Sequence, residues 1–168
     1  MKLFRRQEKN PEIEEERSAR PEDLLFDPGT ELYMPWYLHM RLEEEVKRAV
    51  RHGRPLTIIV CVPQELPGQK GTQAVETISP QFGRLLRGGD IVGQIEEEVI
   101  AVGLPETPES GARVLAQRLR SELVLRAAHV SRRNWLVGWA VCPRDGEDIE
   151  ALLEFALTAA RQSRQAAA

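Results

Sequence analysis

The stretch "IVGQIEEEVIAVGLP", residues 91–105, contains two apolar, β-branched runs separated only by Glu96, Glu97 and Glu98. A connection this short joins neighbouring antiparallel strands, so the stretch predicts a β-hairpin with three glutamates at its tip. Clustered carboxylates are ligands that hard cations prefer. Three adjacent glutamates in a turn point in different directions, however, so a solvated tip is the favoured interpretation.

The sequence on both sides of this hairpin alternates between helical and strand patterns. Apolar residues recur at helical spacing in 37–50, with Pro35 suited to the first turn and Gly53 to the end of the helix. The continuous apolar run 56–62, "LTIIVCV", predicts a strand buried on both faces. The remaining predicted elements are a Pro/Gly/Gln-rich loop over 63–81, a short helix over 82–87, an amphipathic helix over 107–124, a strand over 134–142 and a final helix over 145–165.

The predicted order is helix, strand, helix, hairpin, helix, strand, helix. Helices that return over a sheet containing an antiparallel hairpin indicate an α/β sandwich of ferredoxin-like type, with a central mixed, mostly antiparallel sheet flanked by helices. A chain of 168 residues is long enough for one domain and a tail. We expect this domain at 23–165, preceded by a charged arm or short polar helix at 1–22 that lacks an apolar stripe.

Composition and charge exclude several classes of protein. The net charge of −3 argues against a general nucleic-acid binder, which needs a basic surface. No apolar run approaches the roughly 20 residues of a membrane helix, and the N-terminus lacks the apolar core of a signal peptide, so a cytoplasmic protein is expected. The two cysteines, Cys61 and Cys142, have no metal-ligand spacing and are interpreted as buried, reduced thiols.

Patterns typical of catalysis are poor. His39, His52 and His129 have no carboxylate pattern that would bring them together, and they are interpreted as ordinary surface or core residues. The sequence contains no glycine-rich phosphate loop of the P-loop or dinucleotide type. We therefore predict no metal site and no cofactor.

Four segments carry a family resemblance that extends over 23–165. The segment "DPGTELYMP" (27–35) is similar to the pattern DxLTGLYNR, and "GRPLTIIVCV" (53–62) and "VIAVGLPET" (99–107) match the strands around a GGDEF signature. The segment "LVGWAVCPRDGEDIEALLEFALTAARQ" (136–162) matches a closing strand, a P-x-D-G turn and a last helix. In order and spacing the chain resembles the GGDEF domain of diguanylate cyclases, a nucleotidyl-cyclase-type fold that joins two GTP molecules into cyclic di-GMP.

The resemblance implies that the catalytic signature has been lost. Counting back from "AVGLPET", Glu96, Glu97, Glu98, Val99 and Ile100 occupy the signature position. Glutamate side chains there would obstruct and repel a triphosphate, and Val99 cannot bind a metal ion. The family's metal-binding aspartate at the end of the first strand corresponds to Val62, and Gln64 stands at the next acidic place. Two-metal phosphoryl chemistry needs several carboxylates, so we expect no cyclase activity.

The resemblance also implies a ligand site that survives. In the family, an RxxD motif five residues before the signature binds the product, and here that motif is Arg87-Gly88-Gly89-Asp90, with Arg118 at the place of an assisting arginine. A guanidinium can bind the O6/N7 edge of guanine or a phosphate, and a carboxylate accepts from guanine N1 and N2. Arg126, Arg132 or Arg133 could add to the rim. The alternative interpretation of Arg87 and Asp90 is a surface salt bridge or a helix-end cap.

Three functional hypotheses follow. The leading one is a catalytically inactive GGDEF-like domain that acts as a cyclic di-GMP receptor through Arg87, Asp90 and Arg118 and signals to an unidentified protein partner. The second is a protein-interaction or homodimerisation module that binds no nucleotide, supported by the aromatic residues Tyr33, Trp36 and Tyr37. The third and least favoured is residual GTP binding without turnover, which the Glu96-Glu97 turn opposes.

Overall fold

The computed structural model describes residues 24–64, 73–96, 98–130 and 135–163. The expected N-terminal arm at 1–22 lies outside these ranges. Within them, the elements follow the predicted order: α1 (Pro35–His52), β1 (Leu56–Pro63), α2 (Gln73–Leu85), β2 (Ile91–Glu96), β3 (Val99–Pro105), α3 (Glu109–Val130), β4 (Trp135–Cys142) and α4 (Ile149–Gln162). None of the described helices is long and apolar enough to cross a membrane.

The four strands form a single sheet in the order β2-β3-β1-β4, and each neighbouring pair is antiparallel. The hairpin predicted for 91–105 is present as β2 and β3, with Ile91 opposite Gly103 and Glu96 opposite Val99. The apolar run at 56–62 is the central strand β1, which is buried almost throughout. The predicted α/β sandwich is therefore confirmed, and the one parallel pairing in the described part is a bridge between Tyr33 and Gly93.

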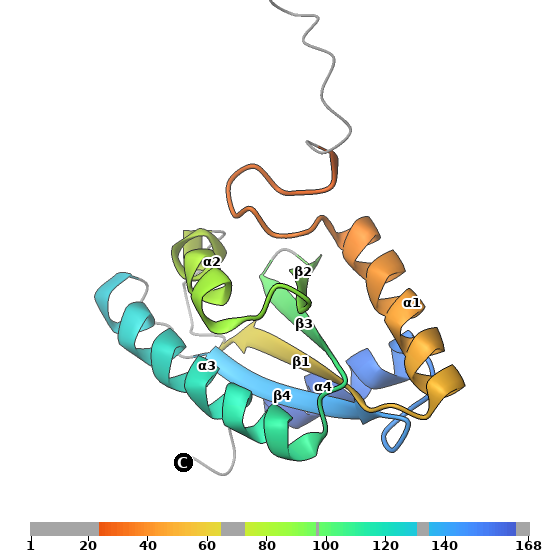
Figure 1. Cartoon of the computed structure of the whole chain (residues 1–168). Coiled ribbons are helices and arrows are strands. Elements are labelled where there is room, and N and C mark those ends of the chain that lie inside the picture. Colours follow the sequence, from red (N-terminus) through yellow and green to blue (C-terminus); the bar gives the residue numbers. More distant parts are fainter. Residues whose placement is uncertain (1–23, 65–72, 97, 131–134, 164–168) are drawn as a thin grey trace, which may run out of the picture.

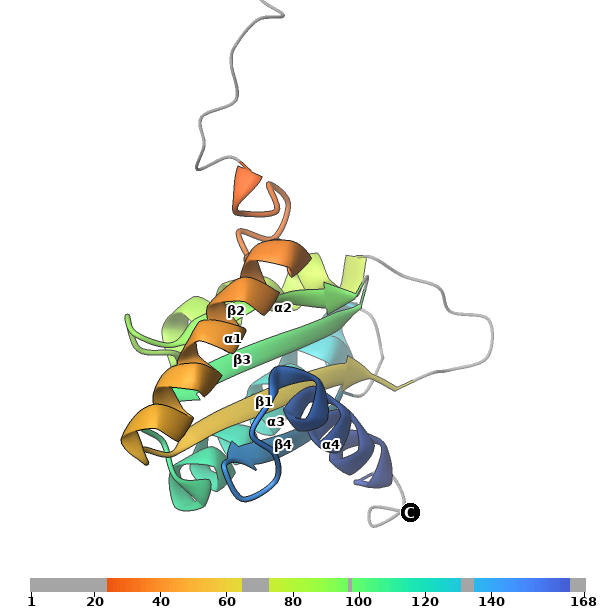
Figure 2. The same ribbon diagram turned by 90° about the vertical axis from the view of Figure 1, so that its right-hand side faces the viewer.

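The helices cover both faces of the sheet (Figures 1 and 2). Side chains of α1 and α4, such as Leu42 and Leu152, pack on one face together with Ile58 of β1. Side chains of α2 and α3, such as Phe82 and Leu119, pack on the other face with Ile59. Successive residues of β1 thus enter opposite cores, which explains why the strand is apolar on both faces. The buried Thr57 is the polar exception, and its hydroxyl donates to Thr107 O at 2.7 Å.

The sequence prediction was wrong about the segment that precedes the hairpin. Residues 73–81 were expected to be a loop because of their proline and glutamine content, but they form most of α2. Pro80 lies inside this helix and has no N–H to donate to the carbonyl of Glu76. The Ser79 hydroxyl donates to that carbonyl instead, at 3.2 Å, so the helix continues to Leu85 and places Ile78 and Phe82 in the core.

The segment before α1 closes one edge of the sheet. The Asp27 carboxylate accepts bonds from the N–H groups of Gly29 (3.0 Å) and Thr30 (2.9 Å), which fixes a tight turn. The turn returns the chain to β2, where Tyr33 N donates to Val92 O and Tyr33 O accepts from Gln94 N. Gly93 permits this approach, because a Cβ on it would lie 2.7 Å from Tyr33 O.

Glu31 in this segment has a φ of 58°, in the left-handed region that disfavours residues with a side chain. Glycine stands at this place in the pattern DxLTGLYNR. We expect Glu31→Gly to raise the free energy of unfolding by about 1 kcal/mol, because it removes this backbone strain. Urea denaturation of the full chain would measure the gain.

Glu31→Ala is the matched control, because alanine removes the same carboxylate but keeps the Cβ. We expect alanine to give none of the stabilisation. Equal effects of glycine and alanine would show that the carboxylate, rather than the backbone conformation, determines stability at this position.

Candidate ligand-binding site

The RxxD motif forms a turn between α2 and β2. The Asp90 Oδ2 atom accepts a hydrogen bond from the backbone N–H of Arg87 at 2.8 Å, and Asp90 N donates to Arg87 O at 3.0 Å. The aspartate therefore closes the turn through the backbone and does not form an ion pair with the Arg87 guanidinium. Gly88 and Gly89 are exposed, and a Cβ on either would meet nothing within 4 Å. The turn is thus open to an approaching molecule.

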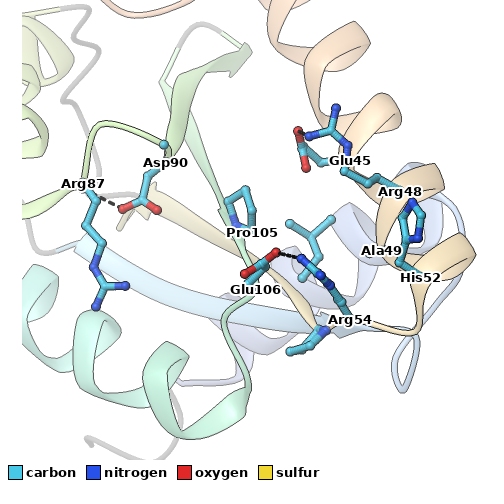
Figure 3. A pocket seen from close by; sticks show the side chains of 12 residues that line it. Glu45, Arg48, Ala49, His52, Arg54, Arg87, Asp90, Pro105 and Glu106 are labelled. Carbon is cyan, nitrogen blue, oxygen red and sulfur yellow. Dashed lines mark hydrogen bonds and ion pairs between the residues drawn. The ribbon is translucent and has the colours of Figure 1, made fainter.

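This turn borders a cavity of about 420 Å³ (Figure 3). The cavity lies at the end of the sheet where β1 and β2 begin and β3 ends, so it is at the opposite end from the tip of the hairpin. Its lining comes from the turn, the last turns of α1, the start of β1 and the end of β3: Glu45, Arg48, Ala49, His52, Arg54, Pro55, Leu56, Arg87, Gly89, Asp90, Pro105 and Glu106. The volume falls within the range of small-molecule sites.

Charges of both signs line the cavity, and two of its three arginines already have acidic partners. Arg48 Nη1 lies 3.1 Å from Oε1 of the buried Glu45, and Arg54 forms an ion pair with Glu106. Arg87 differs, because none of the carboxylates in the described part of the chain pairs with its guanidinium. Figure 3 shows this side chain extending toward α3. Arg87 is therefore the cation of the cavity that is most readily available to an added anion.

The other arginines predicted for this site are not in the lining. Arg118 is an exposed residue of α3 and does not border the cavity. Arg132 and Arg133 lie outside the described residues, and Arg126 belongs to α3 without a described side-chain position. The structure therefore brings Arg87 and Asp90 together at one cavity, and it does not add Arg118 to them.

Sequence reasoning missed the wall of the cavity that α1 supplies. Arg48, His52 and Arg54 belong to the segment "KRAVRHGR" at 47–54, the densest basic run of the domain. Their charge was visible in the sequence. Their position opposite Arg87 was not, because it depends on antiparallel pairing that brings the start of β1 beside the end of β3.

The residues at the expected position of the GGDEF signature lie at the other end of the sheet. Glu96 is the exposed last residue of β2, Glu98 is half-buried in the turn, and Glu97 lies outside the described residues. Cys61 pairs with Ile100, so Val62 and Val99 follow as neighbours on adjacent strands, and both pack against the core beneath α1 and α4. Within the described ranges, no group of three or more His, Cys, Asp or Glu residues is arranged to hold a metal ion.

The two cysteines are separate and buried, as the sequence predicts. Removal from water raises the pKa of the Cys61 thiol to about 12. Cys61 is therefore protonated at neutral pH and is a poor nucleophile. We assign both cysteines to the core.

These features define an α/β sandwich of the nucleotidyl-cyclase type. The family model described as "Diguanylate cyclase, GGDEF domain" matches residues 24–168. The chain therefore belongs to the GGDEF domain family. A search of curated proteins found no match.

Solved structures support the same fold. A sensory box/GGDEF family protein from Caulobacter crescentus has a TM-score of 0.70 at 20% identity, over 84% of this chain and 99% of that one. The GGDEF domain of DgcB from the same organism, in complex with cyclic di-GMP, has a TM-score of 0.72 at 17% identity, over 86% and 92%. The diguanylate cyclase SiaD from Pseudomonas aeruginosa, in complex with its activator SiaC, has a TM-score of 0.73 at 23% identity, over 86% and 60%.

Proposed function

We propose that this chain is a catalytically inactive GGDEF domain that binds cyclic di-GMP at Arg87 and Asp90 and transmits its occupancy to a protein partner. The observation that carries this proposal is the cavity beside the RxxD turn, where Arg87 has no carboxylate partner in the described chain. The ligand bound to the similar DgcB domain is cyclic di-GMP, which supports the ligand class.

The chemistry of the turn suits a guanine nucleotide. Asp90 uses Oδ2 to hold the turn, so Oδ1 is available to accept from guanine N1 and N2. The Arg87 guanidinium can bind the O6/N7 edge or a phosphate. The exposed Gly88 and Gly89 leave room for a flat purine beside the backbone. Arg118 would have to reach the ligand from outside the cavity.

The proposed loss of catalysis rests on the other end of the sheet. Val62 and Val99 present methyl groups at the two places where the family pattern expects metal-binding carboxylates. Glu98 alone cannot hold two Mg²⁺ ions against a triphosphate. We expect no cyclic di-GMP when the full chain is incubated with GTP and Mg²⁺ or Mn²⁺, and chromatographic detection of that product would refute the proposed inactivity.

Isothermal titration of the full chain with cyclic di-GMP tests the receptor proposal. We expect a dissociation constant near or below about 10 µM and a loss of about 30-fold or more in Arg87→Ala and in Asp90→Asn. Asparagine can still accept the Arg87 N–H bond that holds the turn, but its amide opposes the guanine N1 and N2 donors. Arg118→Ala separately tests whether that residue contacts the ligand.

Arg84→Ala is the matched control, because Arg84 is an exposed arginine at the same end of α2 that does not line the cavity. Cyclic di-AMP is the control ligand, since adenine lacks the N1–H and N2–H donors from which Asp90 would accept hydrogen bonds. The receptor proposal fails if the unaltered chain gives no heat at high micromolar ligand, or if Arg87→Ala binds as well as Arg84→Ala.

A second candidate function is protein interaction through the start of α1. The Phe26 and Tyr33 rings stack with centroids 4.7 Å apart, and Tyr37 packs edge-on against Tyr33 at 4.8 Å. Tyr33 and Tyr37 are half-buried, whereas Trp36 is 55% exposed. Sedimentation at increasing concentration, compared with Trp36→Ala, would test whether two copies associate here. Association that is absent, or unchanged by the substitution, argues against this dimer.

A further inference from the structure

The two edges of the sheet differ in how their backbone groups are satisfied. The strand order makes β2 and β4 the edge strands. The outward groups of β2 are bonded to Tyr33, which accepts from Gln94 N at 3.1 Å and donates to Val92 O at 3.2 Å. An edge that is covered in this way offers little to another strand.

The described bonds to the outward groups of β4 involve Val137 and Val141. Arg120 Nη2 donates to Val137 O at 2.7 Å, and Val141 both donates to Asp145 Oδ2 and accepts from Asp145 N, each at 2.8 Å. Outward-facing groups recur at every second residue of a strand, so Trp139 also faces away from β1. No described residue bonds to the outward N–H and C=O of Trp139. In the middle of β4, Trp139 is therefore the residue whose outward N–H and C=O both remain available to a further strand within the described part of the chain.

A groove of about 300 Å³ surrounds this place. Its floor is Val137, Gly138 and Trp139, and its walls come from Arg120 of α3 on one side and from Phe155, Ala159 and Ser163 of α4 on the other, with Arg144 at the rim. Phe155 is 46% exposed, so part of its ring is available to another apolar side chain. The groove thus combines an apolar wall with the outward backbone N–H and C=O of Trp139.

The charge of the groove comes from two arginines, of which only one is available. Arg144 is bound to Asp145 at 2.7 Å and also to Glu109. Arg120 donates one N–H to Val137 O, and within the described ranges it has no carboxylate partner. A guanidinium has five N–H donors, so Arg120 can still bind a carboxylate.

We infer that the β4 edge is a peptide-binding site, and that it takes a short extended segment of a partner protein in which an acidic residue stands between two apolar ones. The residue that pairs with Trp139 places its side chain on the same face as the Trp139 ring, which packs on the α2 and α3 side. Arg120 of α3 lines the groove beside Trp139. A carboxylate is favoured there. Its two neighbours point to the opposite face, toward Gly138 and Phe155, where apolar side chains are favoured.

The segment is expected to be short, because Val137 O on one side of Trp139 and both outward groups of Val141 on the other are already bonded. A peptide that pairs only in the middle of β4 gains few backbone bonds, so its affinity is modest and depends on the two side-chain contacts. This inference does not depend on the proposed nucleotide site, which lies at a different place on the domain.

The test is a titration of the ¹⁵N-labelled full chain with the acetylated, amidated peptide Ser-Val-Glu-Val-Ser, followed by NMR. We expect the Trp139 amide to shift and its hydrogen exchange to slow, with a dissociation constant of about 1 mM. The peptide with glutamine in place of glutamate should bind about 5-fold more weakly. Arg120→Gln should remove this preference for glutamate. Arg113→Gln is the matched control on the same helix and should keep the preference.

Four results would overturn the inference. The first is no shift at Trp139 with about 5 mM peptide, and the second is equal binding of the glutamate and glutamine peptides by the unaltered chain. The third is a Trp139 amide that is protected from hydrogen exchange at every protein concentration without peptide. This would mean that the chain covers its own β4 edge. The fourth is protection of the Trp139 amide from hydrogen exchange that grows with protein concentration in the absence of peptide. This would mean that a second copy of the chain occupies the β4 edge.

Discussion

Replacing Gly138 with alanine is expected to lower the free energy of unfolding by at least about 3 kcal/mol, the largest stability effect that we predict for a single methyl group. A Cβ at this position would lie 2.2 Å from Ala156 O and 2.3 Å from Ala160 N. Both atoms belong to the backbone of α4, so no side-chain rotation can relieve the overlap. The helix would have to move away from β4, which would open the core that contains Leu152 and Ala156.

Urea denaturation of the full chain measures this effect, and Gly83→Ala provides the matched control. Gly83 is an exposed residue inside α2, and a Cβ there would meet nothing within 4 Å. Alanine is favoured over glycine in a helix, so Gly83→Ala should raise stability by about 0.5–1 kcal/mol. A Gly138→Ala chain that unfolds at the same urea concentration as the unaltered chain would refute the close packing of α4 on β4.

The elements with a clear local pattern could be predicted from the sequence. The hairpin of β2 and β3 is marked by two apolar runs with a three-residue separation, and β1 by a seven-residue run in which only Thr57 is polar. The helix α1 is marked by its apolar spacing together with Pro35 and Gly53, and Gly53 indeed has a φ of 60° at the end of the helix. These features depend on neighbours in the chain, which is why a pattern reveals them.

One element was misplaced for a local reason, and other features were missed because they depend on residues far apart in the chain. The start of α2 was misplaced because Pro80 normally argues against a helix, and only the folded chain shows Ser79 replacing the lost donor. Arg87 and Asp90 could be selected by the spacing of the motif, but the wall formed by Arg48 and Arg54 required the sheet register. Arg118 was selected by its place in the family pattern; it does not border the cavity, and its contact with a ligand stays a prediction.

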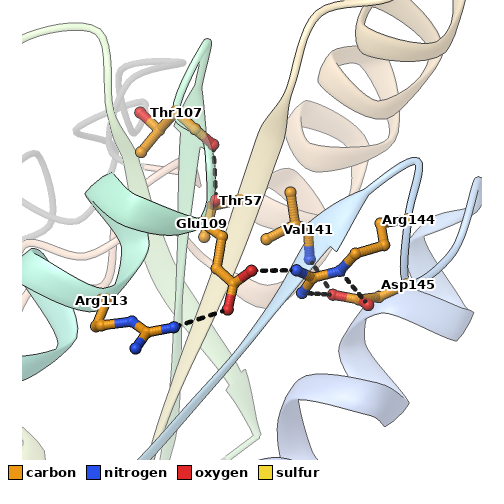
Figure 4. A network of polar contacts seen from close by, with 7 residues as sticks. All are labelled: Thr57, Thr107, Glu109, Arg113, Val141, Arg144 and Asp145. Atoms are coloured by element: carbon orange, nitrogen blue, oxygen red, sulfur yellow. Dashed lines mark hydrogen bonds and ion pairs between the residues drawn. The ribbon is translucent and has the colours of Figure 1, made fainter.

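A polar network between α3 and the turn after β4 was also not visible in the sequence (Figure 4). Glu109, at the start of α3, is bound to Arg113 and to Arg144, and Arg144 is bound in turn to Asp145. The Asp145 carboxylate also accepts from Val141 N at 2.8 Å. The Asp145 side chain is only 8% exposed, so it has little water to replace a lost partner.

Asp145→Asn is therefore expected to cost about 2 kcal/mol at pH 7, because an amide cannot replace the charge-assisted bonds to Arg144. Arg144 and the Val141 N–H together hold the pKa of Asp145 below its usual range, despite the opposing effect of burial. A carboxylate whose folded-state pKa is lowered stabilises the fold above its unfolded-state pKa of about 4. That contribution is lost as the pH falls through the lowered pKa.

The difference in the free energy of unfolding between the unaltered chain and Asp145→Asn should thus have its full value at pH 7. It should shrink as the pH falls below about 4. Urea denaturation at pH 7 and at about pH 3 would measure it. Glu154→Gln, at an exposed position of α4, removes the same charge and should differ little from the unaltered chain at either pH. A difference at Asp145 that stays constant with pH would mean that the side chain stabilises the turn by its shape and not by its charge.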